Sequence, residues 1–284
     1  MRYDFDALAR LSDADVTAWA ARSLAPQNAT LVVVGALDVG EAERLVRERF
    51  HDWPARASDA SLYGLPSIPP PPPRDIVIFD RPAFSQTSVH LLCPLGPVTA
   101  TDLAAQYVTR RYVQNLWRSL RYGSGATDSL DVHSYAYRGG AAFLALESPV
   151  QNDQAVVAVR TTLIGIGLAA QARAPLSALQ LAKWDVARAT RIDNLELDDM
   201  VATLAQLERL GLPPLATLRA LPAKISAVSA ADVAGILGPC AGHEVLGLVG
   251  PAAVLAPALA AEGLAATLLA GELLHDRESS GLAP

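Results

Sequence analysis

Cysteine is nearly absent from this chain. Only Cys93 and Cys240 occur among its 284 residues, so the sequence contains no Cys-x-x-Cys metal motif and too few cysteines for a disulfide-stapled scaffold. The interpretation that the sequence favours is two buried thiols, which pack as small apolar side chains. The alternative is a single disulfide.

The sequence also lacks a long apolar run and a strong excess of one charge. Its most apolar region, residues 251 to 274, is interrupted by Pro257, Glu262 and Gly263, so no membrane span is expected. Its first six residues are too charged for a secretory signal. The net charge of -6 provides no general attraction to nucleic acid or anionic membranes. We therefore expect a soluble chain, cytoplasmic as it stands, and periplasmic if an N-terminal part is missing.

Histidine is scarce and scattered. None of the five histidines lies four or five residues from another, so no helix face presents two imidazoles to one metal ion. We therefore predict no metal site and no cofactor in this chain. Asp131, His133 and Ser134 have the composition of a catalytic triad, but neighbours on a strand point to opposite faces. No catalytic residue is predicted.

Two segments share a helix-turn-strand pattern. In the first, a helix begins after Ser12, and the apolar run at residues 30 to 35 predicts a buried strand. A further helix is predicted at residues 39 to 50. Near the end of the chain, Ser229 again precedes a helical segment, and residues 244 to 250 form the matching strand. The repetition indicates a duplicated architecture whose first copy is truncated.

Five consecutive prolines, residues 69 to 73, lie between the two copies. A stiff interdomain linker is the favoured interpretation, and an SH3-type ligand is the alternative. We therefore divide the chain into the second part of an N-terminal α+β domain (1–65), a Pro-rich linker (66–74), a C-terminal α+β domain (75–250) and a tail (251–284).

The C-terminal domain combines strands and helices. Strand patterns occur at residues 75–80, 87–93, 129–136 and 141–147. Helical patterns occur at residues 101–121, 153–171, 177–191 and 197–211. This order predicts an α+β fold of two-layer domains, in which helices cover one face of a largely antiparallel sheet.

Arginines gather along the helical segment 101–121, at positions 110, 111, 118 and 121. A solvated helix face is one interpretation of this basic cluster. Anchoring of the backbone or carboxylate groups of a peptide is the other, because a guanidinium group offers forked donors. Nucleic acid is not expected as a partner, since no aromatic platforms are interleaved with the arginines.

Three stretches together resemble one peptidase family. LSDADVTAWAARSLAPQNATLVVVGALD (11–38) is similar to the end of its N-terminal domain, and FDRPAFSQTSVHL (79–91) to the entry strand of its C-terminal domain. LWRSLRYGSGATD (116–128) resembles a Leu-Arg, Gly, Ala-Thr pattern in that second domain. The family is that of the pitrilysin/insulinase-type zinc metallopeptidases, and the similarity covers most of residues 8 to 250.

The resemblance implies two related α+β domains that close around unfolded peptide. In that family the first domain holds zinc through an inverted histidine-glutamate motif, which is absent here. The second contributes an arginine and, seven residues later, a tyrosine that bind substrate. These positions fall on Arg121 and Asp128, and Gln86 stands where the family usually carries glutamine. An aspartate cannot donate a phenolic hydrogen bond, so this substrate-binding set is only partly kept.

The predicted function is that of a non-catalytic member of the peptidase family. It would be the peptide-binding half of a zinc metallopeptidase assembly, with zinc in a partner chain, as a heterodimer or through self-association. The alternative is a structural or assembly subunit that keeps the fold without proteolysis. Because the resemblance begins inside the N-terminal domain, residues 1 to about 60 should show an unpaired sheet edge and an exposed apolar helix face.

Overall fold

The computed structural model describes residues 8–54, 71–96, 99, 102–127, 129–137, 142–193 and 196–269. Asp128, His275 and most of the predicted linker lie outside these residues. The chain forms two compact units. The first consists of Met1–Ile68 with Asp193–Glu208, and the second of Pro69–Ile192 with Arg209–Pro284.

The first unit contains short helices that begin where the sequence predicts. Helix α2 spans Asp13–Ser23 and helix α3 spans Val39–Phe50, with the 3-10 turn η1 (Pro26–Asn28) between them. Helix α7 (Leu197–Arg209) also belongs to this unit, apart from its last residue. Ser12 and Asp38 cap α2 and α3 by accepting hydrogen bonds from first-turn backbone N–H groups.

The buried strand predicted at residues 30 to 35 is wrong. This segment forms no strand, and the side chains of Leu31 and Val33 are 58% and 54% exposed. A strand needs a neighbour for its backbone groups, and the described residues provide none beside it. Helices α2 and α3 bury no residue either, and Trp19 is 53% exposed. Residues 8–54 thus expose an apolar helix face, as expected, but they form no strand and therefore not the expected unpaired sheet edge.

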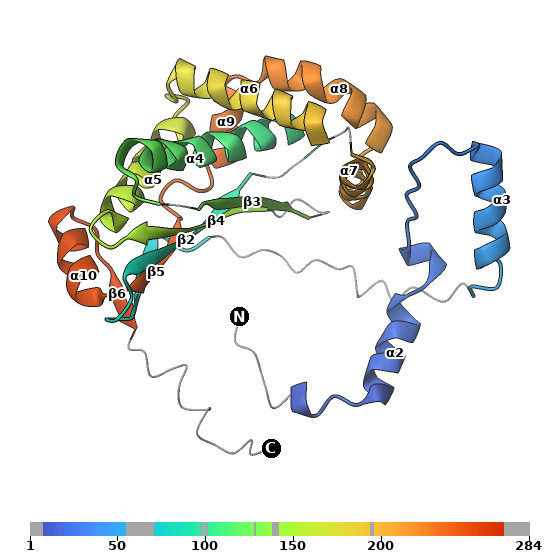
Figure 1. The fold of residues 1–284 in the computed structure, drawn as a ribbon, viewed down its shortest axis with the longest axis horizontal. Helices are drawn as coiled ribbons and strands as arrows, with labels where there is room; N and C mark the ends of the chain where they lie inside the picture. The colour runs from blue at the N-terminus through green and yellow to red at the C-terminus, as the bar shows by residue number, and fades with distance from the viewer. Residues whose placement is uncertain are drawn as a thin grey trace. The chain divides into compact units, whose positions relative to one another are not determined.

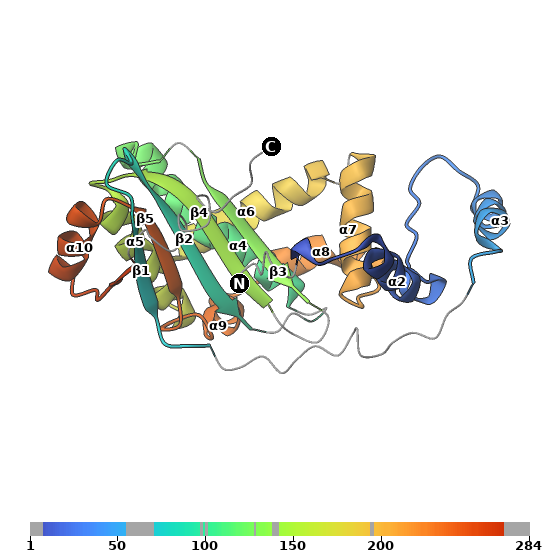
Figure 2. The same cartoon turned by 90° about the horizontal axis from the view of Figure 1, so that it is seen from below.

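The second unit is built on a six-stranded mixed sheet in the order β3-β4-β2-β5-β1-β6. Its strands are β1 (Asp75–Asp80), β2 (Gln86–Leu95), β3 (Asp131–Ala136), β4 (Ala142–Gln151), β5 (Val245–Gly250) and β6 (Thr267–Leu269). The pairs β3–β4, β4–β2 and β2–β5 are antiparallel, whereas β1 runs parallel to β5 and β6. Seen from below, the strands lie in front of the helices (Figure 2).

A layer of helices covers one face of this sheet, as predicted (Figure 1). It comprises α4 (Leu103–Ser124), α5 (Ala155–Ala170), α6 (Leu176–Asp193), α8 (Pro214–Ala227) and α9 (Ala230–Leu237). Helix α10 (Ala252–Ala261) packs against β1 and α5. The core between the layers includes fully buried Val89, Trp117 and Leu248. The observed fold is therefore α+β with two layers.

The two segments that repeat in sequence begin their helices in the same way. Ser12 and Ser229 each accept a hydrogen bond from the backbone of the third helical residue, Asp15 or Asp232. Each aspartate in turn accepts a hydrogen bond from the backbone N–H of its serine. The Ser229 hydroxyl also donates to the Asp232 carboxylate at 2.7 Å. This bond and the weaker effect of the Ser229 backbone N–H lower the pKa of Asp232 below its ordinary value. Only the second repeat continues into a paired strand, β5.

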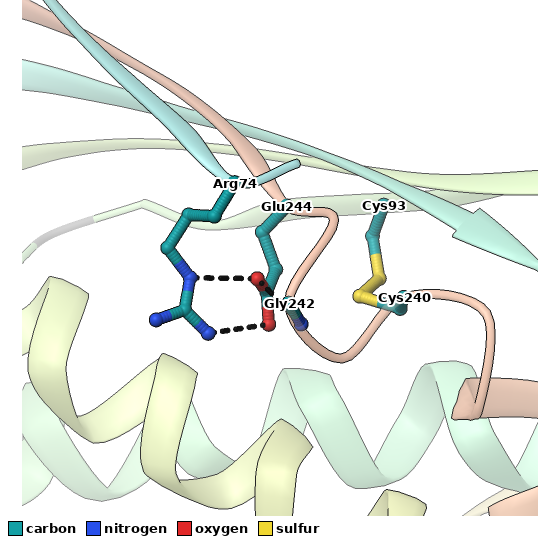
Figure 3. Close-up of a disulfide and its surroundings, with 5 residues drawn as sticks. All are labelled: Arg74, Cys93, Cys240, Gly242 and Glu244. Carbon is teal, nitrogen blue, oxygen red and sulfur yellow. Dashed lines mark hydrogen bonds and ion pairs between the residues drawn. A yellow bond between two sulfur atoms is a disulfide. The ribbon is translucent and has the colours of Figure 1, made fainter. Parts of the chain in front are cut away.

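The two cysteines form a disulfide, which corrects the prediction of two free thiols (Figure 3). Cys93 lies on β2 and Cys240 follows α9, and their Cα atoms are 5.1 Å apart. Both residues are fully buried. The sequence could not indicate this pair, because the partners are 147 positions apart. The bridge ties the turn between α9 and β5 to the centre of the sheet.

A buried carboxylate lies close to this bridge (Figure 3). Glu244, just before β5, is 0% exposed and accepts hydrogen bonds from Nε and Nη2 of Arg74 at 2.8 and 3.2 Å. The backbone N–H of Gly242 donates a third, at 3.1 Å. Arg74 immediately precedes β1, so this ion pair joins the beginnings of the parallel strands β1 and β5.

Among the described helices, none is by itself both long and apolar enough to cross a membrane. One bent pair, α8 with α9, meets the criterion by length and composition when the two helices are taken together.

Candidate functional site

Arg121, the predicted anchor for peptide, lies in the last turn of α4. The helix ends at Gly125, which adopts the left-handed conformation at φ 65° and donates its N–H to the Arg121 carbonyl at 3.0 Å. Glycine suits this position because it carries no Cβ. The Arg121 guanidinium lies 6.0 Å from the centre of the Tyr122 ring. No hydrogen bond or ion pair of this guanidinium is seen with any described residue, so its donors remain available.

The turn after Arg121 is held by the neighbouring strand. The Gln151 backbone N–H at the end of β4 donates to the Ala126 carbonyl at 3.0 Å, and its side-chain amide donates to the Gly125 carbonyl at 3.3 Å. The hydroxyls of Thr127 and Ser148 are buried and lie 2.7 Å apart. These contacts fix the end of α4 against β4, so the backbone that carries Arg121 has a defined position.

Gln86, the second predicted binding residue, is exposed at the start of β2. It pairs with Gln151 across the β2–β4 ladder, and Gln151 in turn bonds to the turn after Arg121. The sheet therefore brings the beginning of β2 and the end of α4 to one end of the second unit. Asp128, the third predicted residue, lies outside the described residues.

A basic pocket of about 280 Å³ opens beside Arg121. We define it by its arginines, which come from two helices: Arg111, Arg118 and Arg121 from α4, and Arg188 from α6. The three α4 arginines are spaced by seven and three residues, so they share one helix face. Gln114, Trp117, Tyr122, Thr127 and Leu130 complete the lining.

The pocket corrects the composition of the basic cluster predicted from sequence. Arg110 does not line it, and its guanidinium instead lies 6.0 Å from the centre of the Tyr107 ring. Arg188 takes its place, although it lies 67 positions beyond Arg121 in the sequence. Only the packing of α6 beside α4 could reveal this contribution.

One carboxylate accompanies these arginines. Asp185 on α6 is 6% exposed and accepts hydrogen bonds from Arg118 Nη1 at 3.3 Å and from the Asn115 amide at 3.2 Å. Burial lowers the pKa of Arg111 below its ordinary value, Asp185 opposes this change, and the neighbouring arginines reinforce it. Within the described part of the chain, the four arginines of the basic pocket therefore have one acidic neighbour, Asp185.

The described residues do not provide a zinc site. No group of three or more histidine, cysteine, aspartate or glutamate side chains comes together among them. His90 has one acidic neighbour, with 3.8 Å between its Nδ1 and Glu147 Oε2. His243 Nδ1 is 2.8 Å from the Pro72 carbonyl oxygen. The residues present in this part of the chain do not fit a tetrahedral zinc centre, which needs three or four such ligands.

Comparison with known proteins gives one family match. A family model described as the peptidase M16 inactive domain matches residues 10–184. A search of curated protein sequences found no match.

Solved structures share the fold. The peptidase M16 inactive domain from Pseudomonas fluorescens is 17% identical, with a TM-score of 0.70, over 85% of this chain and 58% of that one. A protease from Helicobacter pylori is 12% identical, with a TM-score of 0.72, over 87% of this chain and 61% of that one.

A third solved structure also contains a similar chain. It comes from complex III2 of Candida albicans and is 14% identical, with a TM-score of 0.64, over 86% of this chain and 60% of that one. The present chain thus spans about three fifths of the length of each of these structures.

Proposed function

Because this chain belongs to the peptidase M16 inactive-domain family, we propose that it binds extended peptide, which a zinc-bearing M16 partner cleaves. The chain itself performs no cleavage. The observation that carries the proposal is Arg121. It is exposed, its backbone is held by the contacts of Gln151, and it lines a pocket rich in other cations. Guanidinium groups with available donors bind carbonyl and carboxylate oxygens well.

The roles within this proposal follow from the chemistry of each group. Arg121 donates hydrogen bonds to a peptide carbonyl or carboxylate, and Gln86 offers an amide at the start of β2 to the peptide backbone. Asp128 stands where the family resemblance places a tyrosine, and its carboxylate would repel a developing oxyanion. Hydrolysis and zinc are therefore assigned to the partner, which is another M16 chain that carries the zinc motif.

The first prediction concerns Arg121→Ala in the assembled protein. Losing a hydrogen bond from a charged donor costs about 1.5–3 kcal/mol, so peptide cleavage by the chain with its zinc-bearing partner should fall about 10- to 100-fold in kcat/KM. The control is Arg219→Ala, since Arg219 is exposed on α8 and does not line the basic pocket. Equal rates for wild type and Arg121→Ala would remove the anchor role.

The second prediction concerns metal content. The purified chain alone is expected to retain far less than one equivalent of zinc after dialysis, because its histidines lack the spacing of a zinc motif. Elemental analysis by mass spectrometry checks this directly. One tightly held equivalent in the isolated chain would contradict the assignment of zinc to a partner.

A structural subunit is the second candidate function. The similarity to a chain of complex III2 favours it at the level of fold, and Asp128 at the tyrosine position agrees with a loss of proteolysis. The two functions differ in one outcome. A structural subunit would co-purify with its partner, yet Arg121→Ala would leave peptide cleavage and peptide binding unchanged.

We also propose that the chain folds in an oxidising compartment. The buried Cys93–Cys240 bridge supports this, because structural disulfides persist in the periplasm and other oxidising environments and are rare in the reducing cytosol. Of the two compartments expected from sequence, the periplasm is the one that agrees with a disulfide. Trapping of free thiols in freshly lysed cells would test it, and two alkylated cysteines per chain would argue for a reducing compartment.

A further inference from the structure

The basic pocket holds more positive charge than an anchor for peptide backbone requires. One guanidinium group is enough to donate to a carbonyl oxygen, yet four arginines line this cavity of about 280 Å³. Hydrogen bonds to a neutral carbonyl gain little from additional cations. Several converging cations are instead typical of sites for carboxylate or phosphate groups.

Asp185, which lies beside the pocket and does not line it, forms an ion pair with only one of these arginines. Asp185 contacts Arg118 and Asn115. No ion pair is seen for Arg111, Arg121 or Arg188 with any described residue at 4.0 Å or less. Like charges held close together repel each other, more strongly where burial reduces the screening by water. Among the described residues, three of the four arginines therefore have no paired carboxylate, and a bound anion would stabilise them.

Two further features suit a ligand. The Nε1 atom of Trp117, a residue of the pocket lining, is buried and has no hydrogen-bond partner within the described part of the chain. Arg188 lies over the ring of Trp184, with 5.6 Å between its guanidinium carbon and the ring centre. This stacking contact limits the side chain's freedom and leaves its N–H donors available at the pocket.

We propose that the basic pocket selects acidic side chains, so that the chain prefers peptides in which aspartate or glutamate follows the segment bound at Arg121. Arg111 and Arg188 bind the side-chain carboxylate, while Arg121 binds the backbone of the peptide. This specificity rests on the proposed peptide-binding function. It assigns a substrate class, acidic unfolded peptide, to a site for which the sequence indicated a basic cluster and a peptide anchor.

The test compares two labelled peptides on the full chain by fluorescence anisotropy. One is a short unstructured peptide that carries glutamates, and the other is its twin with glutamines. Both have amidated C-termini, so that only side-chain carboxylates differ. One charge-assisted hydrogen bond is worth about 1.5–3 kcal/mol, so the glutamate peptide should bind about tenfold or more tightly. Added salt should reduce this preference, since it screens exposed charges.

Variants test whether the preference for the glutamate peptide depends on the pocket arginines. Arg188→Gln and Arg111→Gln should each remove most of the preference for glutamate, measured as the ratio of the two dissociation constants. Arg219→Gln, an exposed arginine of α8 outside the pocket, should keep the full preference. A preference that survives both pocket variants would overturn the proposal.

The outcomes separate this inference from the function on which it rests. If both peptides bind the wild type equally and Arg121→Ala weakens both, acidic selection is wrong and the peptide-binding function stands. If neither peptide binds the wild type, with or without the partner chain, the peptide-binding function itself fails and the inference fails with it.

Discussion

Removing the disulfide is expected to lower the free energy of unfolding by about 5 kcal/mol, the largest change that any substitution discussed here should produce. The bridge closes a loop with a sequence separation of 147. Loop-closure entropy for a loop of this length stabilises a folded chain by about 5 kcal/mol in the chain-entropy model. In the double variant Cys93→Ala/Cys240→Ala, the unfolded chain regains that conformational freedom.

The packing around the bridge adds to this loss. Both sulfur atoms lie in the core between the sheet and the helical layer, where Cys93 and Cys240 are fully buried. Replacing each by alanine leaves a small cavity, and cavities in a close-packed core destabilise the folded state. The part of the fold that should loosen first is the turn from α9 into β5, since the bridge ties it to β2.

Urea denaturation of three samples measures the effect. The oxidised wild type should unfold at the highest urea concentration, and the reduced wild type and the double variant should both unfold at much lower concentrations. Adding a reductant to the double variant is the control, and it should change nothing. If reduction leaves the unfolding midpoint of the wild type where it was, the bridge contributes no stability and the prediction fails.

Elements with a strong local pattern could be predicted closely from the sequence. The helix predicted at residues 39 to 50 is α3, and the strand predicted at residues 75 to 80 is β1. In both cases local features of the structure agree with the prediction, because Asp38 caps α3 and β1 is a β-branched apolar run. The two-layer arrangement followed from the order of these elements.

Residues 30 to 35 show where local patterns stop being sufficient. Their apolar, β-branched composition indicates a strand that another segment buries, but it cannot specify which segment that is. The same kind of composition predicted β5 correctly, because β1 and β2 pair with it on either side in the sheet. A strand prediction therefore depends on neighbours that the segment itself does not encode.

Long-range contacts were the second kind of feature that could not be predicted from the sequence. Neither the Cys93–Cys240 bridge nor the approach of Arg188 to the α4 arginines leaves a trace in residue spacing. Helix α8 was not predicted, and its segment contains Pro214 and Pro222, which weaken a helical pattern. Pro214 occupies the first turn, where proline fits because its nitrogen needs no hydrogen bond. Buried Leu221 and Ile225 hold the helix in place around Pro222.

Arg74→Ala is expected to cost about 3 kcal/mol of unfolding free energy. Breaking a buried ion pair from one side costs about 3–5 kcal/mol, because it leaves a charge without compensation. The lower end applies here for two reasons. The Arg74 side chain is 36% exposed, so water can reach the space it leaves, and Glu244 keeps the hydrogen bond from Gly242.

Two further variants isolate the cause. Arg160→Ala removes the partner of Glu262 from a surface ion pair whose side chains are 53% and 37% exposed, and such pairs contribute about 0–1 kcal/mol. The double variant Arg74→Met/Glu244→Leu removes both buried charges and should recover most of the loss, since apolar replacement of a buried pair is often neutral. Chemical denaturation measures the free energy of unfolding of all three variants.

If Arg74→Ala lowers the free energy of unfolding no more than Arg160→Ala does, then the Glu244 carboxylate does not depend on Arg74. If the double variant is as unstable as Arg74→Ala, the ion pair matters for the geometry where β1 and β5 begin, and not for compensating a buried charge.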